Sequence, residues 1–424
     1  MRVFKFGGAS IKDAAALQNM QQIIKQFGQG QALVVVVSAM GKTTNAIEGI
    51  LQAFWEGDAH ECLIADLYQF HLNICQAIFW NKTHPVFADV ERYFEALRQA
   101  LVRNNETTFN ELYDQVVSFG ELISSVIVTH SLQAEGLKVV WQDARDLIKT
   151  DSNWREGQVD WKATQKQVGK ILKPLLAEHI VLTQGFIGGT IDKKTTTLGR
   201  EGSDYSTAIL ANCLQAESQT IWKDVAGVLN GDPKRVQDAQ LFAQLSYQEA
   251  AEMTYYGATV IHPKTIAPLR EKGIPLYVKS FLQPQKAGTC INGVQAHKFV
   301  PAVMYKEKQV WVRWTLKDFA FLSEAQVGEI LGQCHAAQVA VYAMNREAFA
   351  LQICTDHRLE KLEKVVKATK KMFTLVLEEG VELLTVKGGD EAYTNALAYG
   401  KTKLWEARQG SWYQAVWRCD KLIG

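Results

Sequence analysis

The segment 195–206 brings hydroxyls, glycines, one guanidinium and two carboxylates together just ahead of an apolar helical pattern; it reads Thr-Thr-Thr-Leu-Gly-Arg-Glu-Gly-Ser-Asp-Tyr-Ser. Gly199 and Gly202 would let its backbone approach a ligand closely, and the N–H groups that open the helix near Ser203 favour an anion. The pattern predicts a phosphate-handling loop. The same residue types also form ordinary helix caps, so the interpretation depends on partners elsewhere in the chain.

Lys5 stands at the end of a short β-branched and aromatic run, and Phe6 separates it from Gly7 and Gly8. An ammonium at that point emerges at the carboxyl edge of a parallel sheet, where α/β proteins bind ligands, and it predicts a phosphate clamp. A solvated strand end is the alternative interpretation. The chain has neither GxxxxGK followed by Ser or Thr nor a spaced GxGxxG, which argues against Walker-type and dinucleotide sites.

Three further segments carry polar side chains or glycines where a predicted strand meets a loop: 37–45, 117–121 and 184–189. The first offers the hydroxyls of Ser38 and Thr44, the second the carboxylate of Glu121, and the third the paired glycines Gly188 and Gly189. One such edge is common in any α/β protein. Together with the strand end at Lys5, these segments make four such edges in one domain. Four edges that converge on a single crevice predict an active site.

The pattern around these loops predicts the elements that position them. Short buried runs such as 3–6 and 33–37 are each followed by a Gly or Ser turn and a helical pattern, which is typical of α/β folds. The alternation continues to about residue 222 and predicts a mostly parallel sheet between helices. A strongly helical stretch, 58–105, lies within it and predicts an added helical layer.

The character of the chain changes near residue 295, because short strands and helices then alternate without phosphate-type loops. This change predicts a catalytic domain over 1–295 and a second region over 296–424. The patterns in 309–377 follow the order βαββαβ, the split-βαβ arrangement. A second, shorter copy is predicted within 381–417.

Composition narrows the range of partners. The 424-residue chain is 47% hydrophobic and 21% charged, and its formal charge of +1 gives no global field to attract nucleic acid or an anionic membrane. The longest apolar stretch, 32–37, has the length of a strand, which predicts neither secretion nor membrane spanning. The seven cysteines are scattered without metal-site spacing. We expect a cytoplasmic protein with a small-molecule ligand.

Six ordered motifs together resemble those of the aspartate kinases of the amino-acid-kinase superfamily: 5–8, 37–45, 118–121, 195–206, 222–234 and 256–263. The resemblance implies an α/β fold, a three-layer αβα sandwich of the amino-acid-kinase type, followed by a C-terminal α+β ferredoxin-like region of tandem ACT regulatory modules. It also implies ATP- and Mg²⁺-dependent phosphorylation of the side-chain carboxylate of L-aspartate to 4-phospho-L-aspartate. That reaction is the first step towards lysine, threonine, methionine and diaminopimelate.

The resemblance further implies roles on the phosphoryl side. Lys5 would hold the transferring phosphoryl group and Asp204 would orient Lys5, while Mg²⁺ is held mainly by the nucleotide phosphates. Ser203 would cap the helix that carries Asp204. Backbone amides near four glycines would share the phosphate charge: Gly7, Gly8, Gly188 and Gly189. Five residues would line the nucleotide pocket: Trp222, Lys223, Asp224, Asp232 and Lys234.

The implied amino-acid side uses complementary charges. Arg200 would grip a substrate carboxylate with its planar guanidinium, and Glu121 would receive the α-ammonium. Hydroxyl contacts would come from Ser38, Thr44 and Ser203. The attacking carboxylate has a reference pKa of about 3.9, so it is ionised at neutral pH and needs no general base.

Four positions depart from the family pattern. Ala9 stands where Thr is usual, and Glu201 stands where the loop most often has a second glycine. Lys223 replaces a usual Thr, and Thr259 stands where a nucleotide-facing Lys is common. Compared with the family pattern, a positive charge is absent at position 259 and present at position 223, in motifs that serve the same nucleotide. We therefore hypothesise that Lys223 compensates for Thr259.

Two alternatives remain open on the sequence. One is a related kinase acting on a glutamate-type substrate; the other is a catalytically silent subunit that regulates a partner through its ACT-like modules. The same modules imply a lysine or threonine effector and a homodimer or higher oligomer. His262, just before Pro263, is expected to be a structural hydrogen-bonder, and Asp66, Glu111 and Asp114 are expected to lie on solvated helix faces.

Overall fold

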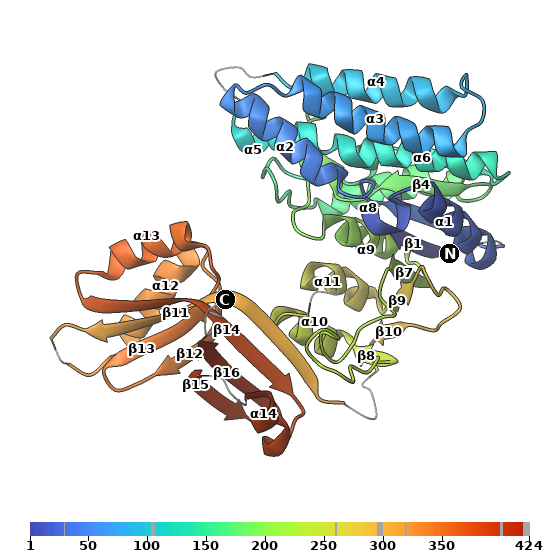
Figure 1. Ribbon diagram of the computed structural model, residues 1–424. Helices are drawn as coiled ribbons and strands as arrows, with labels where there is room; N and C mark the ends of the chain where they lie inside the picture. Colours follow the sequence, from blue (N-terminus) through green and yellow to red (C-terminus); the bar gives the residue numbers. More distant parts are fainter. Residues whose placement is uncertain are drawn as a thin grey trace. The chain divides into compact units, whose positions relative to one another are not determined.

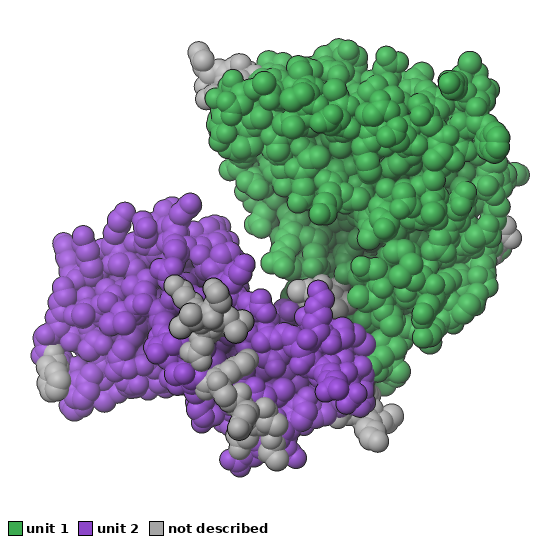
Figure 2. Space-filling model, viewed as in Figure 1, with its two compact units in different colours: residues 1–228, 241–251, 260–296 green, residues 229–240, 252–259, 297–424 purple. Residues whose placement is uncertain are grey.

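The computed structural model describes residues 1–28, 30–102, 107–258, 261–294, 300–318, 320–398 and 402–418. The chain forms two compact units, coloured separately in Figure 2. The first comprises residues 1–228, 241–251 and 260–296, and the second comprises 229–240, 252–259 and 297–424. Two short segments that precede residue 295 therefore group with the C-terminal region.

Within the described residues, the first unit is built on an eight-stranded sheet with the order β3-β4-β2-β1-β7-β9-β10-β8. Its strands are β1 (Arg2–Phe6), β2 (Leu33–Val37), β3 (Val139–Gln142), β4 (Ile180–Gln184), β7 (Ser218–Lys223), β8 (Gln244–Ser246), β9 (Leu276–Ser280) and β10 (Thr289–Asn292). The strands from β3 to β9 run parallel, and β10 is antiparallel to β9. The wholly buried β2 has helices on both sides, as parallel sheets require.

Helices cover both faces of this sheet (Figure 1). Along the chain they are α1 (Ala14–Phe27), α2 (Thr43–Glu56), α3 (Glu61–Ile78), α4 (Pro85–Ala100), α5 (Phe109–Val117), α6 (Phe119–Ala134), α7 (Ala144–Leu147), α8 (Trp161–Leu175), α9 (Gly202–Leu214), α10 (Tyr247–Tyr255) and α11 (Pro263–Lys272), with a 3₁₀ turn, η1 (Gly8–Ile11). α6 packs on one face and α8 and α9 on the other, while α3 and α4 add an outer helical layer beyond α6. The predicted αβα sandwich is confirmed.

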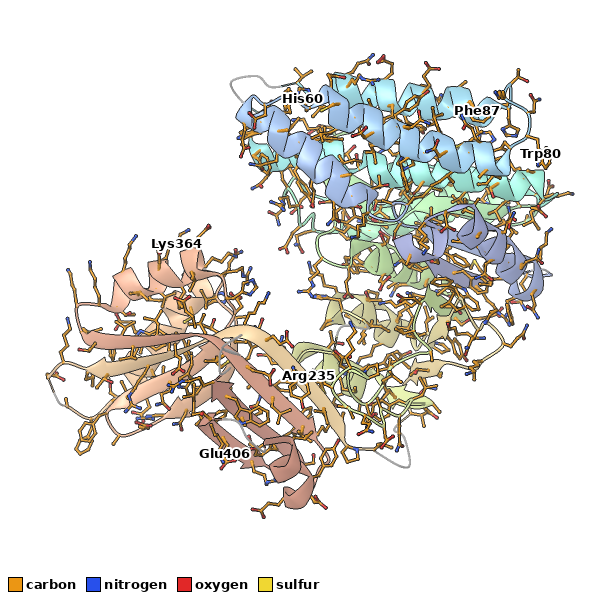
Figure 3. All side chains as sticks on the ribbon, viewed as in Figure 1. His60, Trp80, Phe87, Arg235, Lys364 and Glu406 are labelled. Atoms are coloured by element: carbon orange, nitrogen blue, oxygen red, sulfur yellow. The ribbon has the colours of Figure 1, made fainter. Side chains whose placement is uncertain are left out.

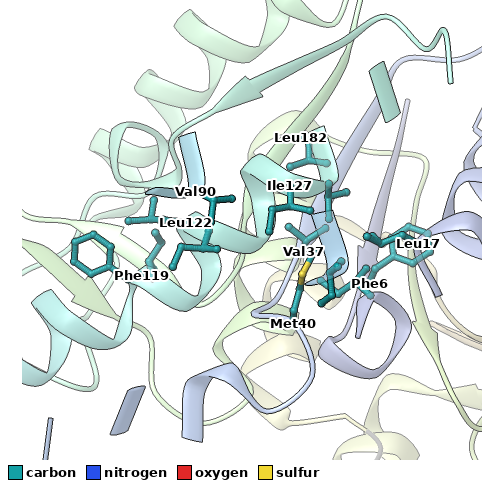
Figure 4. Close-up of a cluster of buried hydrophobic side chains, with 14 of the residues drawn as sticks. Phe6, Leu17, Val37, Met40, Val90, Phe119, Leu122, Ile127 and Leu182 are labelled. Atoms are coloured by element: carbon teal, nitrogen blue, oxygen red, sulfur yellow. The ribbon is translucent and has the colours of Figure 1, made fainter. Parts of the chain in front are cut away.

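The main core lies between the sheet and the layer of α1 and α6 (Figure 4). Strand residues Phe6, Val37 and Leu182 meet Leu17 from α1 and Ile127 from α6. The α5–α6 stretch, 109–134, is long and apolar enough to cross a membrane, but 89% of its apolar window is buried inside the protein. That burial is typical of a core helix.

The second unit contains, in its described part, a six-stranded antiparallel sheet with the order β12-β13-β11-β14-β16-β15. The elements are β11 (Ala302–Leu316), α12 (Glu324–Ala336), β12 (Val341–Arg346), β13 (Ala350–Thr355), α13 (Leu359–Thr369), β14 (Phe373–Lys387), α14 (Glu391–Ala398), β15 (Thr402–Gln409) and β16 (Trp412–Arg418). From β11 to the first half of β14 they follow the predicted βαββαβ order. This α+β region confirms the second half of the predicted fold class.

Two long strands join the halves of this sheet. The first half of β11, 302–306, pairs with residues 383–387 of β14, and the second half, 310–316, pairs with 373–379. Residues 302–306 therefore supply a fourth strand beside β14, β16 and β15. Among the described residues, the second half-sheet has one helix, α14, and takes this strand from upstream, which explains why its sequence looks short.

Arg235 shows why the segment 229–240 belongs with the second unit (Figure 3). Its guanidinium pairs with Glu382 at 2.6 Å and Glu307 at 3.0 Å, and it lies 3.6 Å from the ring centroid of Tyr305. Asn230 adds backbone contacts, since its carbonyl accepts from the Val303 N–H at 2.6 Å. These contacts fix the segment against β11 and β14.

Candidate functional site

Two lysines from neighbouring strands share one buried carboxylate at the centre of the first unit. Lys5 lies on β1, Lys223 ends the adjacent β7, and Asp204 lies in the first turn of α9. The Lys5 Nζ lies 2.7 Å from Asp204 Oδ1, and the Lys223 Nζ lies 3.6 Å from Asp204 Oδ2. Since two cations face one anion, these three side chains carry one net positive charge that can attract a phosphate, and the neighbouring Glu201 opposes it when ionised.

The charge state of this cluster is set by opposing effects. Burial alone would raise the pKa of the Asp204 carboxyl, but Lys5 and Lys223 together hold that pKa below its ordinary value. Asp204 is thus ionised at neutral pH and can keep Lys5 in a fixed orientation.

Glu121 is the second buried carboxylate of the site. It lies in the first turn of α6, and its Oε1 accepts a hydrogen bond from the Ala39 N–H at 3.2 Å. Its Oε2 is buried without a hydrogen-bond partner among the described residues. Burial raises the pKa of Glu121 to about 8, although the Ala39 N–H and the Lys5 ammonium both act to lower it. A buried carboxylate with an unused oxygen suits a cationic ligand.

The glycine turn after β1 brings two loops into contact beside Lys5. A Cβ on Gly8 would lie 2.7 Å from the Ala39 carbonyl oxygen, so only glycine fits. The Gly41 N–H donates to the Gly8 carbonyl at 3.1 Å and ties the two loops together. A Cβ on Gly7 would lie 3.4 Å from the Lys5 Nζ, so this turn lies directly against the ammonium.

The segment 195–206 has a different internal structure from the one expected. Residues Thr195–Thr197 form β6, which pairs with β5 (Ile187–Gly189), and all three threonines are buried. The helix begins at Gly202, and Glu201 holds the N-cap position without a side-chain cap. The prediction that Ser203 caps this helix is wrong, because Ser203 already lies within the first turn.

Glu201 adopts a left-handed backbone conformation, with φ of 53°. Such a conformation favours glycine because a Cβ crowds the following carbonyl, which gives a reason for glycine at this position in the family pattern. Burial and Asp204 raise the pKa of the Glu201 carboxyl, and Lys223 opposes them. Glu201 Oε2 is buried with no hydrogen-bond partner in the described part of the chain.

The residues expected on the amino-acid side surround the same edge of the sheet. Arg200 is exposed on the turn before Glu201. Ser38 follows β2 and is half-buried, and its carbonyl accepts from Ser124 Oγ at 2.7 Å. Thr44 is half-buried in the first turn of α2.

Three residues expected at the nucleotide are used in packing. Cβ atoms on Gly188 and Gly189 would lie 3.0 and 2.7 Å from the backbone oxygens of Ile148 and Arg145, and the Gly189 N–H already donates to Ile148. The Trp222 side chain, 1% exposed, stacks on Phe6 on the sheet face opposite to Lys223.

The other expected nucleotide contacts are more dispersed. Asp224 is exposed directly after β7. Asp232 and Lys234 are exposed and belong to the second unit, where the Lys234 N–H donates to Asp232 Oδ1 at 2.9 Å. Thr259 lies outside the described residues, so the compensation between Lys223 and Thr259 stays a hypothesis.

Asp114 organises the loop, and the expectation of a solvated face there is wrong. Asp114 is fully buried, and its carboxylate accepts from the Thr197 hydroxyl at 2.7 Å, the Thr197 N–H at 3.0 Å and the Arg155 N–H at 2.9 Å. The spacing of polar residues in 109–117 gave no sign of this contact. His262 does act structurally, since its Nδ1 accepts from the Lys264 N–H as the N-cap of α11.

Relatives with similar sequences were found over most of the chain. The lysine-sensitive aspartokinase 3 of Escherichia coli K12 is 29% identical over 399 residues, which cover 92% of this chain and 87% of that protein. A bifunctional aspartokinase/homoserine dehydrogenase of Buchnera aphidicola is 33% identical over 302 residues. That match covers 69% of this chain but 36% of the bifunctional protein.

Solved structures share the fold across both units. Escherichia coli aspartokinase III in complex with aspartate and ADP superposes with a TM-score of 0.84 at 24% identity, covering 98% of this chain and 96% of that one. The aspartate kinase of Clostridium acetobutylicum gives a TM-score of 0.76 at 21% identity, covering 99% and 96%. Residues 1–280 match the model of the family described as the amino acid kinase family. Since this match spans seven of the eight strands of the sheet, the glycine turn and the paired lysines, the chain belongs to the amino acid kinase family.

Proposed function

We propose that this chain transfers the γ-phosphoryl group of ATP to the side-chain carboxylate of L-aspartate, forming 4-phospho-L-aspartate. The observation that carries the proposal is the arrangement of one net positive cluster, Lys5 with Asp204 and Lys223, within electrostatic reach of a buried carboxylate, Glu121. The positive cluster suits a phosphoryl group, and the Glu121 carboxylate suits an amino-acid ammonium. The similarity to aspartokinases over most of the chain supports aspartate as the substrate.

On the phosphoryl side, Lys5 would neutralise charge on the transferring group while Asp204 holds its ammonium in position. The turn at Gly7 and Gly8 would bring backbone close to the same group. Lys223 would contact the nucleotide phosphates. ATP supplies the phosphoryl group, and Mg²⁺ would enter with its phosphates, since Asp204 already faces two lysines.

On the acceptor side, Glu121 would receive the α-ammonium and Arg200 would bind a carboxylate of the substrate. Ser38, Thr44 and Ser203 would supply hydroxyl contacts. The attacking carboxylate is ionised at neutral pH, so positioning and charge neutralisation carry the catalysis.

The decisive experiment measures ADP formation with aspartate and with glutamate as acceptors. We expect ADP formation that depends on aspartate and a much lower kcat/KM for glutamate. No aspartate-dependent ADP formation would contradict the proposal and favour the silent regulatory subunit. A preference for glutamate would support the related kinase instead.

Binding of aspartate should depend on pH through Glu121. In the free protein the pKa of Glu121 is about 8, so most of these carboxyls are protonated at neutral pH and must lose the proton to pair with an ammonium. We expect the KM for aspartate to fall by up to about tenfold per pH unit as the pH rises towards about 8, and then to level off. A KM that stays flat or rises over this interval would contradict the role of Glu121.

The charge at Lys223 should act on the nucleotide alone. Lys223→Met is expected to raise the KM for ATP about tenfold, because a charge-assisted contact is lost, and to leave the KM for aspartate nearly unchanged. Steady-state kinetics with each substrate varied separately would measure this. Equal effects on both KM values would show that Lys223 acts only by supporting Asp204.

Replacing Glu201 should improve the nucleotide site. Glu201→Gly relieves the left-handed backbone and removes a carboxylate beside Lys223, so we expect a severalfold lower KM for ATP and a gain in thermal stability. Glu201→Gln removes the charge but keeps the Cβ, and it should lower the KM without the gain in stability. If both variants raise the KM for ATP, Glu201 instead assists nucleotide binding.

We also propose that the C-terminal sheet binds an amino-acid effector, lysine or threonine, and pairs two or more copies of the chain in the cytoplasm. The lysine-sensitive relative supports lysine as the first candidate. Activity and sedimentation measured while lysine and threonine are titrated separately would decide between them.

A further inference from the structure

A cavity of about 460 Å³ opens on the sheet face opposite to Lys5 and Asp204. Its walls come from alternate residues of three neighbouring strands, β1, β7 and β9, together with the end of α1 and the loop before β10. Alternate residues point to one face of a sheet, so the cavity and the catalytic cluster lie on opposite faces of β1 and β7. Its size is within the range of small-molecule sites.

Two cations line this cavity without a carboxylate partner within ion-pair distance in the described part of the chain: Arg2 and Lys279. Glu217 lines it as well and lies within electrostatic reach of Arg2, but its carboxylate pairs directly with the N-terminal ammonium of Met1, at 2.6 Å. Burial, and then the charge of Arg2, lower the pKa of Lys279. The two cations oppose each other, and an anion between them would relieve that repulsion.

The cavity also presents aromatic rings. The Lys279 Nζ lies 4.9 Å from the ring centroid of Phe27 and 5.3 Å from that of Trp222, so its charge is held over the rings. Tyr277 adds a third ring to the wall. The Trp222 side chain is 1% exposed, and its Nε1 is buried without a hydrogen-bond partner in the described structure. At this burial Trp222 only backs the wall of the cavity, and the rings left to contact a ligand are those of Phe27 and Tyr277.

We propose that this cavity is a second binding site, which takes a small aromatic anion with a flat ring and one carboxylate or phosphate group. The ring packs against Phe27 and Tyr277, and the anionic group lies between Arg2 and Lys279. The proposal does not depend on the proposed phosphoryl transfer, because it is tested by measuring ligand binding and not enzyme activity.

Calorimetric titration of the full chain with phenyl phosphate and with phenylacetate tests the site, in the presence of saturating ADP to occupy the nucleotide site. We expect saturable binding of one ligand per chain, and the tighter of the two probes identifies the anionic group. Lys279→Met and Arg2→Gln should each weaken binding about tenfold or more, because each removes a charge-assisted contact. Lys162→Gln, on an exposed part of α8, is the matched control and should leave binding unchanged.

Absence of saturable binding by both probes would overturn the proposal. Binding that disappears in ADP, or that survives both variants unchanged, would place the probe elsewhere and overturn it too. If a variant fails to fold, control ligands test the site on the unsubstituted chain. Neutral benzyl alcohol and ring-free inorganic phosphate should each bind at least about tenfold more weakly than the better probe. Equal binding by either of these controls would contradict a site for an aromatic anion.

Discussion

Lys5→Met is expected to lower kcat by about 10³-fold or more. The ammonium of Lys5 is buried at the end of β1, 2.7 Å from Asp204, and no other described cation lies as close to that carboxylate. Loss of one preorganised charge at a transferring group typically lowers kcat 10²- to 10³-fold. The variant also removes the nearer of the two cations that face the Asp204 carboxylate. Single-turnover ADP formation would measure the loss.

A double variant separates catalysis from stability. Lys5→Met alone leaves a buried carboxylate with a single cation 3.6 Å away, which should lower the melting temperature. Adding Asp204→Asn removes that charge and should restore much of the stability but none of the activity. Lys25→Met, which breaks an exposed ion pair with Glu135, should leave kcat unchanged. Activity in the double variant would refute the assigned role of Lys5.

Glu121→Gln is expected to raise the KM for aspartate about 10²-fold while the KM for ATP stays nearly constant. The substituted amide has the shape of the protonated carboxyl but cannot pair with an ammonium as an anion. Thermal stability should not fall, because burial already keeps the native carboxyl largely protonated at neutral pH, with a pKa of about 8. Initial rates and a melting curve give the two readouts.

The pH profile provides an independent check on this residue. The fall in aspartate KM between neutral pH and about 8 should disappear in Glu121→Gln, since the titrating group is gone. Glu135→Gln, at the other end of α6 and exposed, is the control that keeps the pH dependence. If the profile persists in Glu121→Gln, another group controls the binding of aspartate.

Local sequence patterns were sufficient to predict most of the strands and helices of the architecture. The apolar runs at β1 and β2, each followed by a small-residue turn, identified the parallel sheet because strands buried on both faces need continuous apolar residues. The helix α12 (Glu324–Ala336) lies within the predicted βαββαβ pattern of 309–377, and its start is a local signal because Ser323 and Gln326 form a capping box.

Contacts between segments that are distant in the sequence could not be predicted from local sequence patterns. Asp114 looked like a surface residue of a helix, and only the approach of β6 buries it under Thr197. The hydroxyls of segment 195–206 looked available for phosphate, but Thr195–Thr197 are used in a strand pair. The strand 302–306 completes the second half-sheet from upstream, which no local pattern indicates.

The sequence by itself determined the fold class, the family and the set of charged residues, because strand periodicity and ordered motifs are local properties of the chain. The tertiary structure decided which charges meet: Lys5 with Asp204 and Lys223, and Glu121 with its unused oxygen. It also decided that Trp222 lines a cavity on the sheet face opposite to Lys5. Burial and the distance between charges set pKa values and ligand affinity, and both depend on segments that meet only when the chain is folded.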